Sequence, residues 1–145
     1  MDPMFSPDGR WIAYESNESG RNEVYVRPFP GPGGKRQIST GGGGFPTWSR
    51  VRRELVYRSG QGGQAGQMFV VSYAVDDESF RVDKARAWSD RVVLNRPRGR
   101  TFDLHPDGER LAVAALPDVP QDKQDRVVLV FNFFDELRRV APVKR

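Results

Sequence analysis

Few side chains in this sequence of 145 residues could carry out catalysis. His105 is the single histidine, and it stands directly before a Pro-Asp-Gly segment. A serine hydrolase needs a nucleophile, a histidine and a carboxylate held together, commonly with the serine in a Gly-x-Ser-x-Gly segment. That segment is absent. We therefore interpret His105 as a turn residue and expect no catalytic site.

Metal and phosphate sites are not indicated either. The sequence contains no cysteine, and its acidic groups are Asp76–Glu78 and the series Asp118, Asp122 and Asp125. Neither group has the regular spacing and central glycine of a calcium loop. The glycine run Gly41–Gly44 connects two expected strands, whereas a phosphate-binding loop leads into a helix. We expect no metal and no cofactor.

Arginine dominates the charge. Lys and Arg total 23 against 19 Asp and Glu, giving a net charge of +4. The calculated pI of 9.8 is a value also seen in nucleic-acid-binding domains. Two arginine clusters stand out, Arg50/Arg52/Arg53 and Arg96/Arg98/Arg100. Acidic residues are interleaved with basic ones, and we expect the two clusters to be solvated turns on opposite faces. The charge pattern therefore predicts no nucleic-acid partner.

An internal repeat supplies the framework for these residues. Three segments align, each with a turn followed by apolar residues: Phe5–Tyr14, Trp48–Tyr57 and Leu104–Val113. Their starting points are 43 and 56 residues apart (48 − 5 and 104 − 48). Units of about 40–45 residues with four strands each are typical of β-propeller blades. The repeat predicts one all-β domain.

Each unit also predicts its strands. Pro-Asp-Gly favours a tight turn, because Pro presets φ, Asp bonds the nearby backbone and Gly accepts a positive φ. The expected strands after these turns are Trp11–Tyr14, Leu55–Tyr57 and Leu111–Leu116, then Val24–Val26, Met68–Val71 and Val127–Phe131, with outer strands at Arg36–Ser39 and Arg91–Leu94. Several runs are apolar on both faces, which requires a covering layer on each side. We expect Trp11, Trp48 and Trp88 to pack between the blades.

The motif from Phe5 to Tyr14 resembles the TolB-type propeller repeat, a relative of WD-repeat blades. The segments Glu15–Pro30, Gln37–Gly43 and Asn132–Leu137 are similar to the propeller region that follows the kinase domain in many bacterial serine/threonine protein kinases. The resemblance implies a binding or sensing module, often extracytoplasmic in its parent proteins. Kinase activity does not transfer, because the Gly-rich phosphate loop and the His-Arg-Asp segment are absent.

The second unit departs from the family pattern, with Val51-Arg52 in place of Asp-Gly. We expect this unit to be the least regular. Restoring Asp-Gly, by Val51→Asp with Arg52→Gly, should raise thermal stability, because glycine suits a positive φ.

Together these observations predict an all-β domain over residues 1–145, built from three four-stranded antiparallel blades of a TolB-like β-propeller. The expected blades span 1–44, 45–101 and 102–145, and the end segment 133–145 is compatible with a strand or a helical turn. Propellers close with about four to eight blades, so three blades predict a homodimer that forms a six-bladed ring.

The predicted function is non-catalytic protein interaction or sensing, with another protein as a possible partner on the loop face. The alternative is a small-ligand or enzymatic propeller with a substrate in its central channel. We expect no membrane insertion and no signal peptide, because no apolar stretch approaches the roughly 18 residues of a membrane span. The sequence leaves the compartment open.

Overall fold

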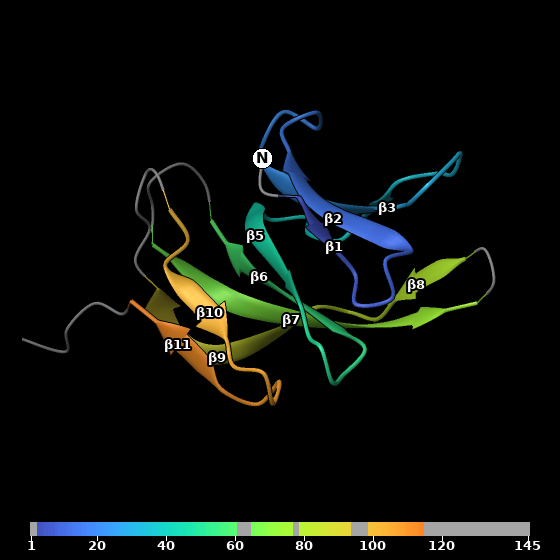
Figure 1. Cartoon of the computed structure of the whole chain (residues 1–145). Coiled ribbons are helices and arrows are strands. Elements are labelled where there is room, and N and C mark those ends of the chain that lie inside the picture. The colour runs from blue at the N-terminus through green and yellow to red at the C-terminus, as the bar shows by residue number, and fades with distance from the viewer. Residues whose placement is uncertain (1–2, 61–64, 77–78, 94–98, 115–145) are drawn as a thin grey trace, which may run out of the picture.

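The computed structural model describes residues 3–60, 65–76, 79–93 and 99–114. Within these ranges every regular element is a β-strand, and paired strands run antiparallel (Figure 1). The expected all-β, antiparallel class is therefore confirmed for this part of the chain. The predicted strand Val127–Phe131 and the segment 133–145 lie outside the described residues.

The first sheet contains four strands in sequence order. They are β1 (Met4–Phe5), β2 (Trp11–Ser16), β3 (Glu23–Pro28) and β4 (Arg36–Gln37). The central strands β2 and β3 contain most of the β-branched and aromatic residues of this sheet, the types that favour strands. The outer strand is two residues long, shorter than the predicted run Arg36–Ser39.

The second sheet contains five strands, one more than predicted. They are β5 (Gly43–Trp48), β6 (Glu54–Ser59), β7 (Gly66–Val75), β8 (Phe80–Val82) and β9 (Arg86–Val93). The long strand β7 has two outer partners, because β8 pairs with its end at Tyr73–Val75 and β9 pairs with its start at Gly66–Val70. Residues 91–93 of the expected outer strand Arg91–Leu94 are thus the end of a longer strand, and Leu94 lies outside the described residues.

The third unit is described as the hairpin of β10 (Phe102–Leu104) and β11 (Leu111–Val113). Strand β11 begins at Leu111 as predicted, and residues 115 and 116 of the predicted strand Leu111–Leu116 lie outside the described residues. The predicted blade limits of 1–44, 45–101 and 102–145, and the number of blades, remain predictions.

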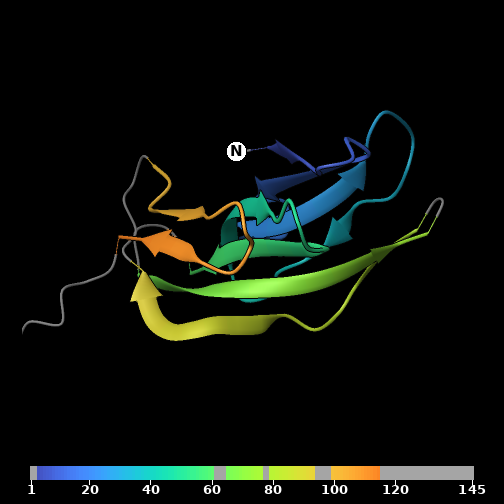
Figure 2. The ribbon, with the colours of Figure 1, turned by 60° about the horizontal axis from the view of Figure 1, so that its bottom comes forward.

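The second sheet is covered on both faces. Leu55, Tyr57 and Val71 pack with Trp11, Val24 and other residues of the first sheet. From the opposite face, Val56, Val70 and Val93 pack with Phe102 and Leu111 of the third hairpin. In Figure 2 the first sheet (blue) lies above the second (green to yellow). This arrangement explains why β6 is apolar at consecutive positions.

The tryptophans occupy these interfaces as expected. Trp11 and Trp48 are buried between the first and second sheets, and both rings contact Phe80, with centroids 4.9 and 6.0 Å apart. Trp88 packs against the apolar residues between the second sheet and the third hairpin.

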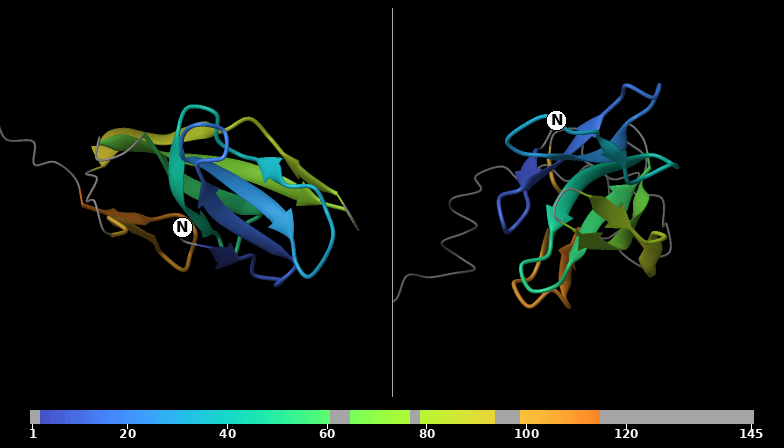
Figure 3. Two further views of the ribbon diagram at one scale, coloured as in Figure 1. Left: turned by 90° about the horizontal axis from the view of Figure 1, so that it is seen from above. Right: turned by 90° about the vertical axis from the view of Figure 1, so that its right-hand side faces the viewer.

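The first strands of the three units, β1, β5 and β10, lie on one side of the molecule, and we call them the inner strands (Figure 3). The other strands of the sheets extend away from them. Trp48 Nε1 donates a 3.0 Å hydrogen bond to the Met4 carbonyl, which joins β5 to β1. Arg100, which precedes β10, donates to Thr47 Oγ1 at 2.9 Å and to the Pro46 carbonyl at 3.3 Å. It also contacts Met4 Sδ at 3.2 Å. Arg100 is therefore a link between the inner strands, and the expectation of a solvated turn is wrong for this residue.

The first and third turns share one geometry. Ser6 N bonds the Trp11 carbonyl and Gly9 N bonds the Ser6 carbonyl, and His105 and Gly108 repeat both contacts. Gly9 and Gly108 both have φ of 70°. A positive φ of this kind favours glycine.

The second turn closes differently. Ser49 N bonds the Glu54 carbonyl as in the other turns, but Arg52 N bonds the Ser49 side chain. Among the described residues other than glycine, a positive φ occurs at Phe45 alone. Arg52 therefore has a negative φ, and the premise for restoring Asp-Gly at this turn is wrong.

Candidate functional site

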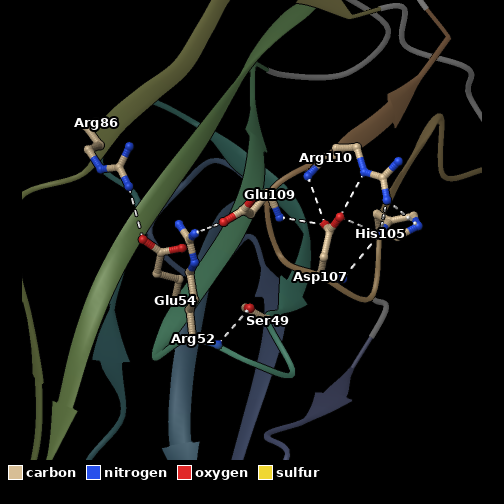
Figure 4. A network of polar contacts seen from close by, with 8 residues as sticks. All are labelled: Ser49, Arg52, Glu54, Arg86, His105, Asp107, Glu109 and Arg110. Carbon is tan, nitrogen blue, oxygen red and sulfur yellow. Dashed lines mark hydrogen bonds and ion pairs between the residues drawn. The ribbon is translucent and has the colours of Figure 1, made fainter.

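The turns after β1, β5 and β10 lie close together. The side chains of Arg52 and Glu109 point toward each other from the second and third turns, with Nη2 and Oε1 2.5 Å apart (Figure 4). A Cβ added at Gly108 would lie 2.8 Å from Ser49 Oγ and 2.9 Å from Val51 Cγ2. This close approach requires glycine in the third turn. The two turns therefore form one continuous surface.

His105 belongs to this surface as a turn residue, in agreement with the interpretation from sequence. Its Nδ1 accepts a 3.2 Å hydrogen bond from Asp107 N, and its ring contacts the Arg110 guanidinium at 3.1 Å. Asp107 also accepts from Glu109 N at 2.9 Å and from Arg110 Nε at 2.8 Å. The hydrogen bond from Glu109 N, followed by the hydrogen bond from Arg110, lowers the pKa of Asp107 well below its usual range. Every contact described for His105 fixes the turn.

A cleft lies between the first and second turns. We call it the arginine cleft, and it has a volume of about 310 Å³. Its charged and polar lining consists of Arg10, Arg50, Arg52, Arg53, Asp8, Ser49 and Tyr73. Tyr73 packs edge-on against Trp48, and Tyr73 N bonds the Arg53 carbonyl. Burial raises the pKa of the Tyr73 phenol, with Asp8 adding to the rise and Arg53 opposing it. The phenol is therefore a neutral hydroxyl at pH 7.

Asp8 is the one carboxylate in the lining of this cleft. Its Oδ1 accepts hydrogen bonds from Ser6 Oγ and Arg10 N, which hold the first turn. Burial pushes its pKa upward, but these hydrogen bonds and the charge of Arg10 outweigh that effect and the pKa is lowered. Asp8 is thus ionised at pH 7 and engaged in its own turn.

A larger groove adjoins the arginine cleft at Arg10, which lines both. We call it the proline groove, and its volume is about 830 Å³. Its apolar lining comes from Trp11, Pro28, Phe29, Pro30, Pro32 and Phe80, and its cations are Arg10, Lys35 and Arg36. Lys35 is paired with Glu18. The groove therefore combines an apolar floor with cationic side chains.

The outer face of the first sheet carries exposed aromatic side chains. Phe5 and Phe29 are 55% and 46% exposed, and their rings meet edge to face with centroids 5.0 Å apart. Phe5, Ile12 and Arg27 are successive cross-strand partners, so they project from the same face. Trp11 and Ala13 project from the opposite face into the core. We define the outer face by Phe5, Ile12, Tyr14, Arg27 and Phe29.

Half of the glycine run has the predicted role of a connection: Gly41 and Gly42 lie between β4 and β5, whereas Gly43 and Gly44 are the first residues of β5. Gly42 N bonds Oε1 of the buried Glu23, and a Cβ at Gly44 would lie 2.5 Å from Glu15 Oε2. Glu23 also pairs with Arg21 at 2.7 Å and accepts from Ser39 Oγ. These contacts attach the run to the first sheet.

Other predicted groups are described in part. Asp76 pairs with Arg81 at 2.5 Å, whereas Asp77, Glu78, Asp118, Asp122, Asp125, Arg96 and Arg98 lie outside the described residues. Over the described ranges, no group of three His, Cys, Asp or Glu side chains is placed to hold a metal ion. In the same ranges, none of the elements is a helix long and apolar enough to cross a membrane.

Sequence reasoning missed the arginine cleft and the exposed pair Phe5–Phe29. The repeat alignment contained a signal for the cleft, because the 43-residue offset places Arg10 in register with Arg53. Equivalent positions of adjacent units lie side by side in a stacked repeat. No such signal was available for Phe29, which follows β3 in a loop.

Comparison with solved structures relates this arrangement to a known fold. The structure of a putative TolB from Agrobacterium tumefaciens superposes with a TM-score of 0.50 at 19% sequence identity. The match covers 79% of this chain and 42% of that chain. The chain has a TolB-like β-propeller fold. It spans less than half the length of that TolB neighbour.

The TolB-like fold agrees with the repeat identified at Phe5–Tyr14. No protein-family model matches the sequence, and no curated protein matches it. At this level of identity the likeness describes the fold alone.

Proposed function

We propose that this chain is a non-catalytic β-propeller module for protein–protein interaction or sensing. The observation that carries the proposal is the outer face of the first sheet, where Phe5 and Phe29 are exposed beside each other. Exposed aromatic pairs of this kind are typical of interaction sites, because aromatic side chains bury large areas on association. The resemblance to propeller regions of bacterial receptor kinases supports sensing as the context.

The partner we propose for this face is a second copy of the chain. The second sheet is covered on both faces by neighbouring units, and the first sheet is covered on its inner face by the second. Among the described residues, neither of the two apolar clusters between the sheets includes Phe5 or Phe29. Two copies of a three-bladed chain would close a six-bladed ring and bury both outer faces.

Light scattering coupled to size exclusion tests this proposal. Wild-type protein is expected to have about twice the mass of the 16.4 kDa chain across the micromolar range. The double variant Phe5→Ser, Phe29→Ser should shift the equilibrium toward the monomer. Val92→Ser is the matched control, because Val92 is an exposed apolar residue on the outer strand β9. A wild-type monomer at every concentration would reject the dimer.

A further inference from the structure

Two arginine side chains of the arginine cleft are not paired with an acidic group in the described part of the chain. Within the described part of the chain, the side chains of Arg50 and Arg53 make no hydrogen bond or ion pair, and both residues are exposed. Arg52 is paired with Glu109, and Asp8 is engaged in the first turn. Like charges held this close together repel one another, so a bound anion would be stabilised.

The charges of the lining can be summed. Arg10, Arg50, Arg52 and Arg53 contribute four positive charges and Asp8 contributes one negative charge. Asp8 offsets Arg10 within the first turn and Glu109 neutralises Arg52 from the adjacent turn, so the charges of Arg50 and Arg53 remain. Carboxylates match this pattern, because the guanidinium group donates two parallel hydrogen bonds to a carboxylate.

The surroundings favour a peptide over a nucleic acid. The Tyr73 ring is half-buried against Trp48 and cannot stack on a base. Beyond Arg10 lies the proline groove, with an apolar floor that includes Trp11 and Phe80. A peptide can supply carboxylates to the cleft and an apolar side chain to the groove.

We propose that the arginine cleft binds an acidic segment of a partner protein, with Arg50 and Arg53 contacting its carboxylates and the proline groove accepting an adjacent apolar residue. This inference rests on the proposed role in protein interaction and assigns that role a second surface. The arginine cleft lies on the turns and shares no residue with the outer face of the first sheet, which the proposed dimer uses. The proline groove shares Phe29 with that face.

The experiment measures fluorescence anisotropy of a labelled octapeptide of alternating glutamate and aspartate with one central leucine, using the full chain. The wild type is expected to bind, and binding should weaken as salt rises from roughly 0.05 to 0.5 M, because screening shortens the range of the charges. Arg50→Gln with Arg53→Gln should weaken binding about tenfold. Lys84→Gln with Arg91→Gln is the control, since it removes the same net charge from exposed positions outside both grooves. It should change the affinity less than twofold.

Several results would overturn the proposal. Absence of peptide binding by the wild type would reject it, and so would an equal loss in both double variants, which would indicate attraction by net charge alone. Tighter binding of an oligothymidylate of matched charge, lost in the Arg50/Arg53 variant, would assign the cleft to nucleic acid. Light scattering on the same samples reports the dimer separately. Failure of peptide binding in an intact dimer therefore rejects this inference and leaves the proposed function standing.

Discussion

The backbone N–H of Arg52 donates a 3.1 Å hydrogen bond to the hydroxyl oxygen of Ser49. In the first turn the equivalent N–H, that of Gly9, bonds the Ser6 carbonyl at 2.9 Å. The second turn thus replaces a backbone acceptor with a side-chain acceptor. This exchange allows Arg52 to keep a negative φ where the other turns need glycine.

Arg52→Gly is expected to lower stability. Glycine adds conformational freedom to the unfolded chain, at a cost of about 0.4–1 kcal/mol, and the exposed ion pair with Glu109 contributes up to about 1 kcal/mol. We expect a decrease of roughly 1 kcal/mol in the free energy of unfolding, measured by denaturant titration. Arg50→Gly is the control, because it adds the same freedom without removing an ion pair, and its effect should be smaller. A more stable Arg52→Gly variant would contradict this account.

Gly9→Ala and Gly108→Ala form a matched pair. Both glycines have φ of 70°, so alanine is strained at each by about 1 kcal/mol. At Gly9 the added Cβ meets no atom within 4 Å, whereas at Gly108 it meets Ser49 Oγ at 2.8 Å. Gly108→Ala should therefore be the more destabilising by at least about 1 kcal/mol. Equal melting temperatures for the two variants would show that the second and third turns separate easily.

Much of this fold could be predicted, because the determining interactions are local. Pro-Asp-Gly at Pro7–Gly9 and Pro106–Gly108 fixes two turns, and the apolar run Leu55–Tyr57 requires cover on both faces. Strand β8 was not predicted, because Phe80–Val82 is three residues long and owes its pairing to the unusual length of β7. Such pairing depends on contacts distant in sequence.

The surfaces were less predictable for the same reason. Arg10 and Arg53 are far apart along the chain, and the stacking of two turns brings them to one cleft. Arg100 is one of a run of alternate arginines, yet its side chain binds Thr47 and Pro46. No local pattern distinguishes it from a solvated arginine.

Glu23→Ala should be strongly destabilising. The Glu23 side chain is fully buried, and its removal leaves Gly42 N and Ser39 Oγ without their acceptor. Each of these two buried groups left unsatisfied costs about 1–3 kcal/mol, so we expect a loss of roughly 2–6 kcal/mol in a denaturant titration. Glu18→Ala removes an exposed partner of Lys35 and should cost less than about 1 kcal/mol. Similar losses in the two variants would exclude a structural role for the buried carboxylate.

Asp107 should make stability depend on pH in the acid range. Its pKa is lowered in the folded state from the ordinary value of 3.8, chiefly by the hydrogen bond from Glu109 N. A group with a lowered folded pKa stabilises the protein above its ordinary pKa, and the effect is lost as the pH falls below it. At neutral pH the melting temperature of the wild type should be higher than that of Asp107→Asn. This difference in melting temperature should shrink below about pH 3.8. A difference that is constant from neutral to acid pH would contradict the assignment.

The position of β6 has a consequence for how the molecule opens. This strand is paired along both edges, with β5 and β7, and its side chains are packed on both faces. Local openings that expose the first sheet or the third hairpin leave these pairings in place. We therefore expect the β6 amides to exchange with solvent deuterium only when the described part of the chain unfolds as a whole. Strand β6 has no proposed contact with a partner. It is nevertheless expected to unfold last, and so to hold in place the elements that carry the proposed binding surfaces.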